Sequence, residues 1–81
     1  MTSVEIEKQI RFGISRLTEQ LDDMWLVLQN IPKGSTQYHI NKASYDAKLG
    51  EITVLGGDWH RDGLGHHKVF LWGITAEPAK E

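Results

Sequence analysis

The sequence predicts an α+β fold in which one long N-terminal helix packs on one face of a three-stranded antiparallel β-meander. Apolar residues recur at alternating steps of four and three from Ile10 to Ile31, which is typical of a helix packed on another element. After Gly34 larger apolar residues alternate with polar ones, which is typical of strands. Glycine-containing turns at 46–50 and 62–65 divide this second part into three strands.

The helix is expected at about residues 3–31. Thr2 and Glu5 have the spacing of a capping box, which indicates a helix start. Pro32 ends the helix, because proline lacks a backbone N–H and disfavours a helical residue before it. One stripe of this helix is apolar throughout: Ile10, Ile14, Leu17, Leu21, Met24, Leu28 and Ile31.

Strands are expected at about residues 36–45, 51–61 and 66–75. Together with the helix they form a single domain over residues 1–81, because a chain of 81 residues has no room for a second core. The polar tail at 76–81 is expected to fray.

Four-residue hairpin loops at 47–50 and 62–65 predict the register of the sheet. The face expected to pack on the helix then holds most of the aromatic residues: Tyr38, Ile40, Leu55, Trp59, Phe70, Trp72 and Ile74. The other face holds a polar group: His39, Asp58, His60 and His67. A slip of one residue would exchange the two faces.

Composition narrows the classes of protein. The chain has no cysteine, which excludes disulfides and favours a reducing, cytoplasmic compartment. Its start has neither the basic region nor the apolar run of a signal peptide, and no apolar stretch is long enough to predict a membrane span. A net charge of −2 gives no basic patch for a phosphate backbone, which argues against nucleic-acid binding.

The helix is more apolar than a small sheet can cover. Residues 24–28 are apolar on all sides of the helix, which is typical of a helix buried all round. A second copy of the chain or a different protein would supply the missing cover, and of the two the sequence favours a homodimer. The expected interface residues are Leu21, Met24, Trp25 and Leu28, because tryptophan is enriched among the residues that dominate interfaces.

The polar group on the opposite sheet face suggests a metal site. His39, His60 and His67 would supply imidazole ligands, with Asp58 as a fourth ligand or as the group that orients an imidazole. Zn²⁺ or another divalent ion fits this set. The alternative is that these side chains only flank an exposed hairpin.

No catalytic motif is present, so the favoured hypothesis is a non-catalytic binding protein that forms a homodimer and binds a macromolecular or small ligand. Small size, no cysteine and no catalytic signature are common among accessory proteins of phages and mobile elements. The competing hypothesis is a small metal- or ligand-binding protein or enzyme that uses His60 and its neighbours. A third is a nucleic-acid-binding sheet that stacks bases on its aromatic residues.

Overall fold

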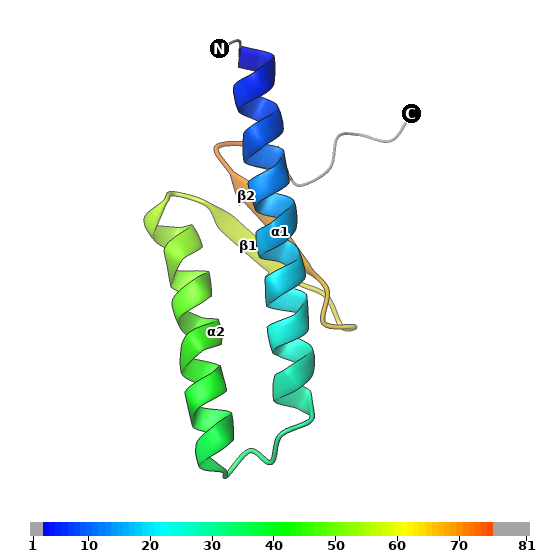
Figure 1. The fold of residues 1–81 in the computed structure, drawn as a ribbon, viewed down its shortest axis with the longest axis vertical. Helices are drawn as coiled ribbons and strands as arrows, with labels where there is room; N and C mark the ends of the chain where they lie inside the picture. Colours follow the sequence, from blue (N-terminus) through cyan, green and yellow to red (C-terminus); the bar gives the residue numbers. More distant parts are fainter. Residues whose placement is uncertain (1–2, 76–81) are drawn as a thin grey trace.

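Two helices lie on one face of a small antiparallel sheet (Figure 1). The computed structural model describes residues 3–75. The helices are α1 (Ser3–Gln29) and α2 (Thr36–Val54), and the strands are β1 (Asp58–Arg61), β2 (His67–Leu71) and β3 (Ile74–Thr75). The strands pair in the order β1–β2–β3. The predicted α+β class, with a long N-terminal helix packed on a three-stranded antiparallel sheet, is therefore confirmed, with a second helix added.

The predicted strand at 36–45 is wrong, because this segment begins α2. Ser35 caps the helix, and its side-chain hydroxyl accepts the backbone N–H of Tyr38 at 3.1 Å. The buried residues of α2 are Tyr45, Leu49 and Ile52, at steps of four and three. The predicted turn at 46–50 and the start of the second predicted strand are also helical. Strand β1 begins only at Asp58.

Helix α1 ends close to the predicted place. Its last turn tightens, since Asn30 N–H donates to Val27 O and Ile31 N–H donates to Leu28 O, and Pro32 follows. The predicted capping residue Thr2 and the tail at 76–81 lie outside the described residues. Within residues 3–75, no helix has the length and apolarity needed to cross a membrane.

The β1–β2 register differs from the predicted one by one residue. The loop holds five residues rather than four, and Asp62 N–H donates to His66 O at 3.0 Å within it. As a result Asp58, not Gly57, lies opposite Phe70. This is the slip that exchanges the two faces of a strand.

Side chains of β2 alternate between the two faces of the sheet. His67, Val69 and Leu71 are buried beneath the helices, whereas Lys68 is exposed on the other face. Trp59 and Ile74 pack against the core as expected. Phe70 lies on the outer face of the sheet and Trp72 in the β2–β3 turn, so both were assigned to the wrong side.

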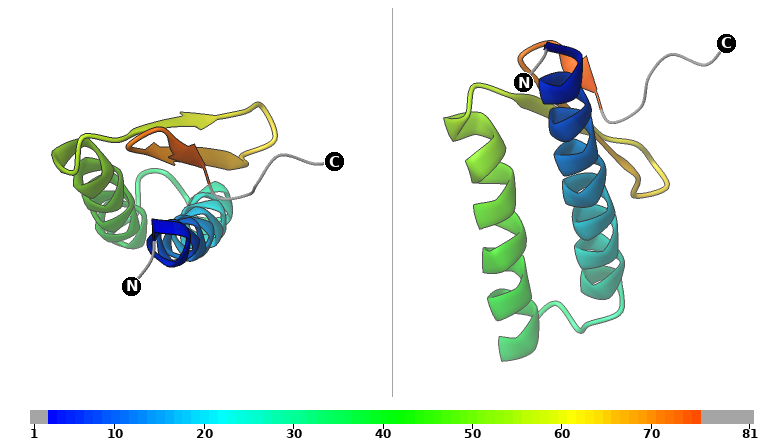
Figure 2. Two further views of the ribbon diagram at one scale, coloured as in Figure 1. Left: turned by 90° about the horizontal axis from the view of Figure 1, so that it is seen from above. Right: turned by 45° about the horizontal axis from the view of Figure 1, so that its top comes forward.

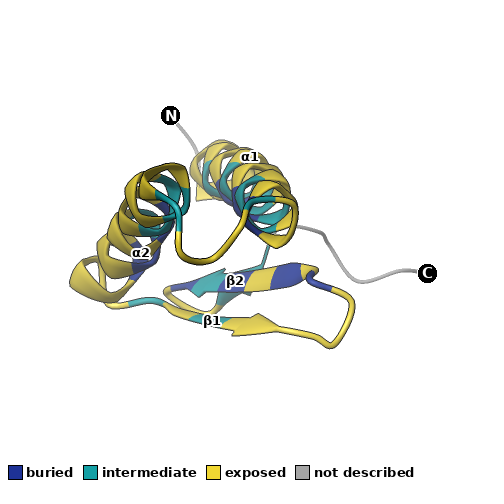
Figure 3. Ribbon diagram, turned by 90° about the horizontal axis from the view of Figure 1, so that it is seen from below, coloured by how far each residue is buried: buried dark blue, intermediate teal, exposed yellow. Residues whose placement is uncertain are grey.

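The core lies between the helices and the sheet, and the buried stripes of α1 and α2 both face it (Figure 3). Its buried apolar residues come from three elements: Ile14, Leu21, Leu28, Tyr45, Leu49, Ile52, Val69 and Leu71. Figure 2 shows the helices side by side on a single face of the sheet. The predicted helix stripe is thus covered within one chain by α2 and β2.

The β2–β3 turn holds its first residue in a strained conformation. Trp72 has φ 54° and Gly73 has φ 80°, the pattern of a two-residue hairpin turn that favours Asn-Gly. Trp72 is 61% exposed, so packing of its ring offsets little of the strain at this residue. Trp72→Asn is expected to stabilise the protein by about 1 kcal/mol, measured as a higher melting temperature. Trp72→Ala keeps the strain and serves as the control; an equal gain from both variants would refute this explanation.

Candidate functional site

Four polar side chains from four elements form one hydrogen-bonded chain beneath the helices. Arg61 of β1 donates to the Tyr45 hydroxyl of α2 at 3.0 Å. The Tyr45 hydroxyl lies 2.6 Å from Nε2 of His67 in β2. Nδ1 of His67 lies 2.8 Å from Oδ1 of Asp22 in α1. This network, called the Asp22–Arg61 chain below, connects both helices to the β1–β2 hairpin.

One assignment of hydrogens gives every donor an acceptor. Arg61 occupies the oxygen of Tyr45, so the Tyr45 hydroxyl donates to Nε2 of His67. Nδ1–H of His67 then donates to the Asp22 carboxylate, which also accepts the backbone N–H of His67 at 2.7 Å. The carboxylate thereby fixes both the backbone and the ring of the first residue of β2.

Trp25 closes over this chain. The guanidinium carbon of Arg61 lies 3.7 Å from the centre of the Trp25 ring, and the ring centres of Trp25 and Tyr45 are 5.5 Å apart. Gly65, at φ +89°, brings the hairpin loop against the ring edge, where an added Cβ would lie 2.6 Å from Trp25 Cδ1. The loop, the indole and the guanidinium therefore pack as one unit.

Two of the four side chains in the Asp22–Arg61 chain are shielded from solvent. Tyr45 is 1% exposed and the His67 side chain is fully buried, so neither can reach a substrate. Asp22, the carboxylate partner of His67, does reach solvent: 31% of its side chain is exposed. Among residues 3–75, no buried side-chain nitrogen or oxygen lacks a hydrogen-bond partner. The Asp22–Arg61 chain therefore links both helices to strands β1 and β2.

The β1–β2 loop is organised by another carboxylate. Oδ1 of Asp62 accepts the backbone N–H groups of Leu64 and His66, each at 2.9 Å. These bonds, the one from His66 foremost, lower the pKa of the Asp62 carboxyl below its ordinary value of 3.8. The loop that covers Trp25 therefore depends on an ionised Asp62.

This lowered pKa predicts a dependence of stability on acid. A carboxyl whose pKa is lower in the folded state stabilises that state above the unfolded pKa, and the contribution is lost as the pH falls through the folded pKa. Wild type should therefore lose more stability than Asp62→Asn between about pH 5 and about pH 3 in urea titrations. Parallel curves for the two proteins would show that Asp62 has no such role. Asp46→Asn, which alters an exposed carboxylate on α2, is the matched control.

The four predicted metal ligands do not come together. His39 lies exposed on α2, and His67 is buried and belongs to the Asp22–Arg61 chain. Asp58 and His60 are both exposed on the outer sheet face, with a closest approach of 3.9 Å. Within the part of the chain that the structure describes, no three His, Cys, Asp or Glu side chains form a group that could hold a metal ion. The expected shared face depended on the four-residue loops and on a strand at 36–45.

The four predicted interface residues divide into two pairs. Leu21 and Leu28 are wholly covered within the single chain, so neither is available to a second chain in this fold. Met24 and Trp25 are half-buried and pack against the core. The Arg61 guanidinium stacks on the Trp25 ring, whereas Met24 lines a groove on the outer side of the helices.

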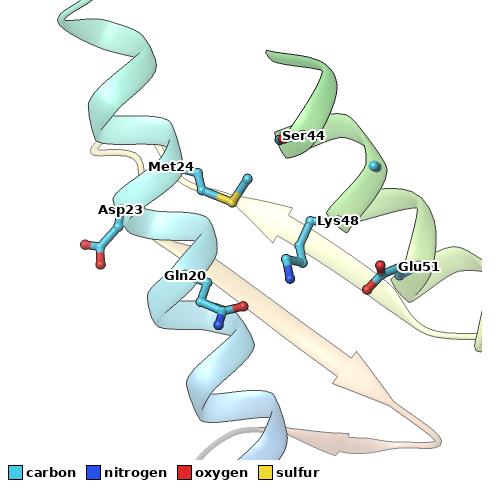
Figure 4. Close-up of a pocket in the computed structure, with 7 residues that line it drawn as sticks. Gln20, Asp23, Met24, Ser44, Lys48 and Glu51 are labelled. Carbon is cyan, nitrogen blue, oxygen red and sulfur yellow. The ribbon is translucent and has the colours of Figure 1, made fainter. Parts of the chain in front are cut away.

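This groove runs between α1 and α2 and has a volume of about 520 Å³. In Figure 4 the strands lie behind the two helices, so the groove opens on the side away from the sheet. Residues from both helices line it: Gln20, Asp23, Met24, Ser44, Ala47, Lys48 and Glu51. Met24 and Lys48 extend into the gap from facing helices (Figure 4). It is called the α1–α2 groove below.

Sequence reasoning missed three members of the Asp22–Arg61 chain. Asp22 and Asp23 are adjacent on α1, so their side chains point in different directions: Asp23 is exposed, whereas Asp22 meets His67. Tyr45 carries a signal that was not used: its spacing of four from Leu49 places both residues on one stripe of a helix. Arg61 carries no local signal, because its partners come from other elements.

Comparisons with known protein families, with curated proteins and with solved structures give no match.

Proposed function

We propose that this protein is a non-catalytic interaction protein that works as a homodimer. The observation that carries the proposal is the distribution of large apolar side chains. Among residues 3–75, ten of them are exposed, whereas eight apolar residues form the buried core. A small chain with this balance gains stability by covering apolar surface with a partner.

The Asp22–Arg61 chain supports the non-catalytic part of the proposal. Its tyrosine and histidine, side chains capable of acid–base chemistry, are buried and engaged with one another. A catalytic group must reach its substrate within hydrogen-bonding distance, which burial of this kind prevents. The absence of cysteine supports a cytoplasmic location, and the small size agrees with an accessory protein that acts by covering a partner's surface.

Sedimentation equilibrium tests the proposal directly. Between about 1 and about 200 µM, the apparent mass should rise from the 9.2 kDa of one chain towards twice that value. The melting temperature should rise over the same concentrations, because dimerisation stabilises the folded state by mass action. A folded protein that remains at 9.2 kDa throughout would refute the homodimer.

A further inference from the structure

We infer that the α1–α2 groove is the dimer interface, and that its occupant is the same groove of a second copy of this chain. The inference rests on the proposed self-association and adds the surface that carries it. The two helical layers would face each other around a two-fold axis, with a sheet on each outer side. Four helices would then pack together, as in a helical bundle.

Exposed apolar residues follow the groove along both helices. Ile40, Ala47 and Val54 recur every seven residues on α2, so they lie along one stripe, and Ala47 lines the groove. On α1, Val27 lies seven residues after Gln20, which also lines the groove. Ile40 and Val54 are 60% and 86% exposed, although nothing in the single chain requires apolar side chains there.

Small residues leave room for a close approach of helices. Ala47 and Ser44 line the groove on α2. On α1, Gly13 lies seven residues before Gln20, and a Cβ added to it would meet no other atom within 4 Å. A glycine at an exposed helical position weakens the helix, and no contact within residues 3–75 accounts for its presence. A helix from a second copy that packs closely against Gly13 would account for a glycine at this position.

The charges of the groove are complementary to themselves. Lys48 is half-buried and extends between the helices, yet its ammonium group has no hydrogen-bond or ion-pair partner within residues 3–75. Asp23 and Glu51 lie exposed at the rim of the same groove. A two-fold axis through the groove brings each copy's Lys48 towards the other copy's carboxylates. A strongly acidic or basic partner would find no such match.

Exposed apolar residues on and beside the groove supply part of the area that a dimer needs. Phe12 lines a neighbouring hollow that shares Gln20 and Asp23 with the groove, and it is 64% exposed. Phe12, Val27, Ile40 and Val54 together expose on the order of 400 Å² of apolar surface, about half of the roughly 800 Å² per partner in a standard interface.

A charged side chain at Ala47, which lines the groove, tests whether the groove is the dimer interface. Ala47→Arg is expected to weaken the dimer at least about 100-fold by sedimentation equilibrium, because the guanidinium would be buried against the second copy. Thr53→Arg adds the same side chain to an exposed position of α2 that does not line the groove, and it should leave the dissociation constant within about threefold. Far-UV circular dichroism confirms that both variants fold.

Reversing the charges of Lys48 and Glu51 tests whether a second copy of the chain binds in the groove. Lys48→Glu leaves the groove with carboxylates alone, and Glu51→Lys gives it two ammonium groups, so each variant should dimerise about tenfold more weakly than wild type. An equimolar mixture of the two should restore dimers, because opposite charges then face each other. The restored dimers should weaken as salt is added.

Each outcome is decisive. A wild-type dimer that Ala47→Arg dissociates and the mixed variants restore confirms the inference. A wild-type dimer whose dissociation constant is unchanged in Ala47→Arg overturns the groove as its interface but leaves the proposed homodimer intact. A wild-type protein that stays monomeric at all concentrations refutes both the homodimer and the groove as its interface.

Discussion

Asp22→Ala is expected to destabilise the folded protein by about 2–3 kcal/mol, measured by urea denaturation. The substitution removes the acceptor of two hydrogen bonds, one from Nδ1 and one from the backbone N–H of His67. The His67 side chain is fully buried, so its ring nitrogen loses a partner that water can replace only by entering the fold. A domain of this size has a total stability of about 4–12 kcal/mol, so the loss is a large fraction of it.

Asp23→Ala is the matched control for this variant. Asp23 is the adjacent residue of the same helix and has the same charge, but it is exposed. Its substitution should change the free energy of unfolding by no more than about 0.5 kcal/mol. Equal effects of the two variants would mean that helix charge, rather than the Asp22–Arg61 chain, determines stability.

Gly57→Ala is expected to cost about 3 kcal/mol or to prevent folding. A Cβ at Gly57 would lie 2.5 Å from the backbone oxygen of Phe70 and 2.5 Å from Leu71 Cδ2. The oxygen belongs to strand β2, so relief requires the sheet to move away from the end of α2. The melting temperature should fall by about 4–8 °C for each kcal/mol lost.

Gly50→Ala is the matched control, with the opposite expected sign. Gly50 lies inside α2, and a Cβ added there meets nothing within 4 Å. Alanine restricts the unfolded chain and favours the helix, so this variant should stabilise the protein by about 0.5–1 kcal/mol. If both glycine substitutions were neutral, the contact between the end of α2 and β2 would be looser than the structure has it.

Helix α1 was predictable because its signal is local and repeated. Its stripe recurs over many turns, and Pro32 ends it, so both the element and its end follow from the sequence. Helix α2 carries a weaker signal. Tyr38 and Ile40 alternate as they would in a strand, and Gly50 interrupts the pattern. Packing of Tyr45 and Ile52 against α1 and β2 overrides these local preferences.

The faces of the sheet depended on a single loop residue. Four- and five-residue hairpins are both common, and the sequence around Gly63 suits either. The hydrogen bonds from Leu64 and His66 to Asp62 select the longer loop. That choice moved His67 from an exposed, metal-binding role in the prediction to a buried position beneath α1.

The amino-acid sequence alone determined the fold class and the first helix, because periodicity and composition are properties of neighbouring residues. Only the tertiary structure decided which surface remains uncovered and which polar side chains meet. Asp22 and His67 are 45 positions apart, and no local pattern relates them. They meet because burying both helix stripes against β2 leaves one arrangement in which the carboxylate and the imidazole satisfy each other.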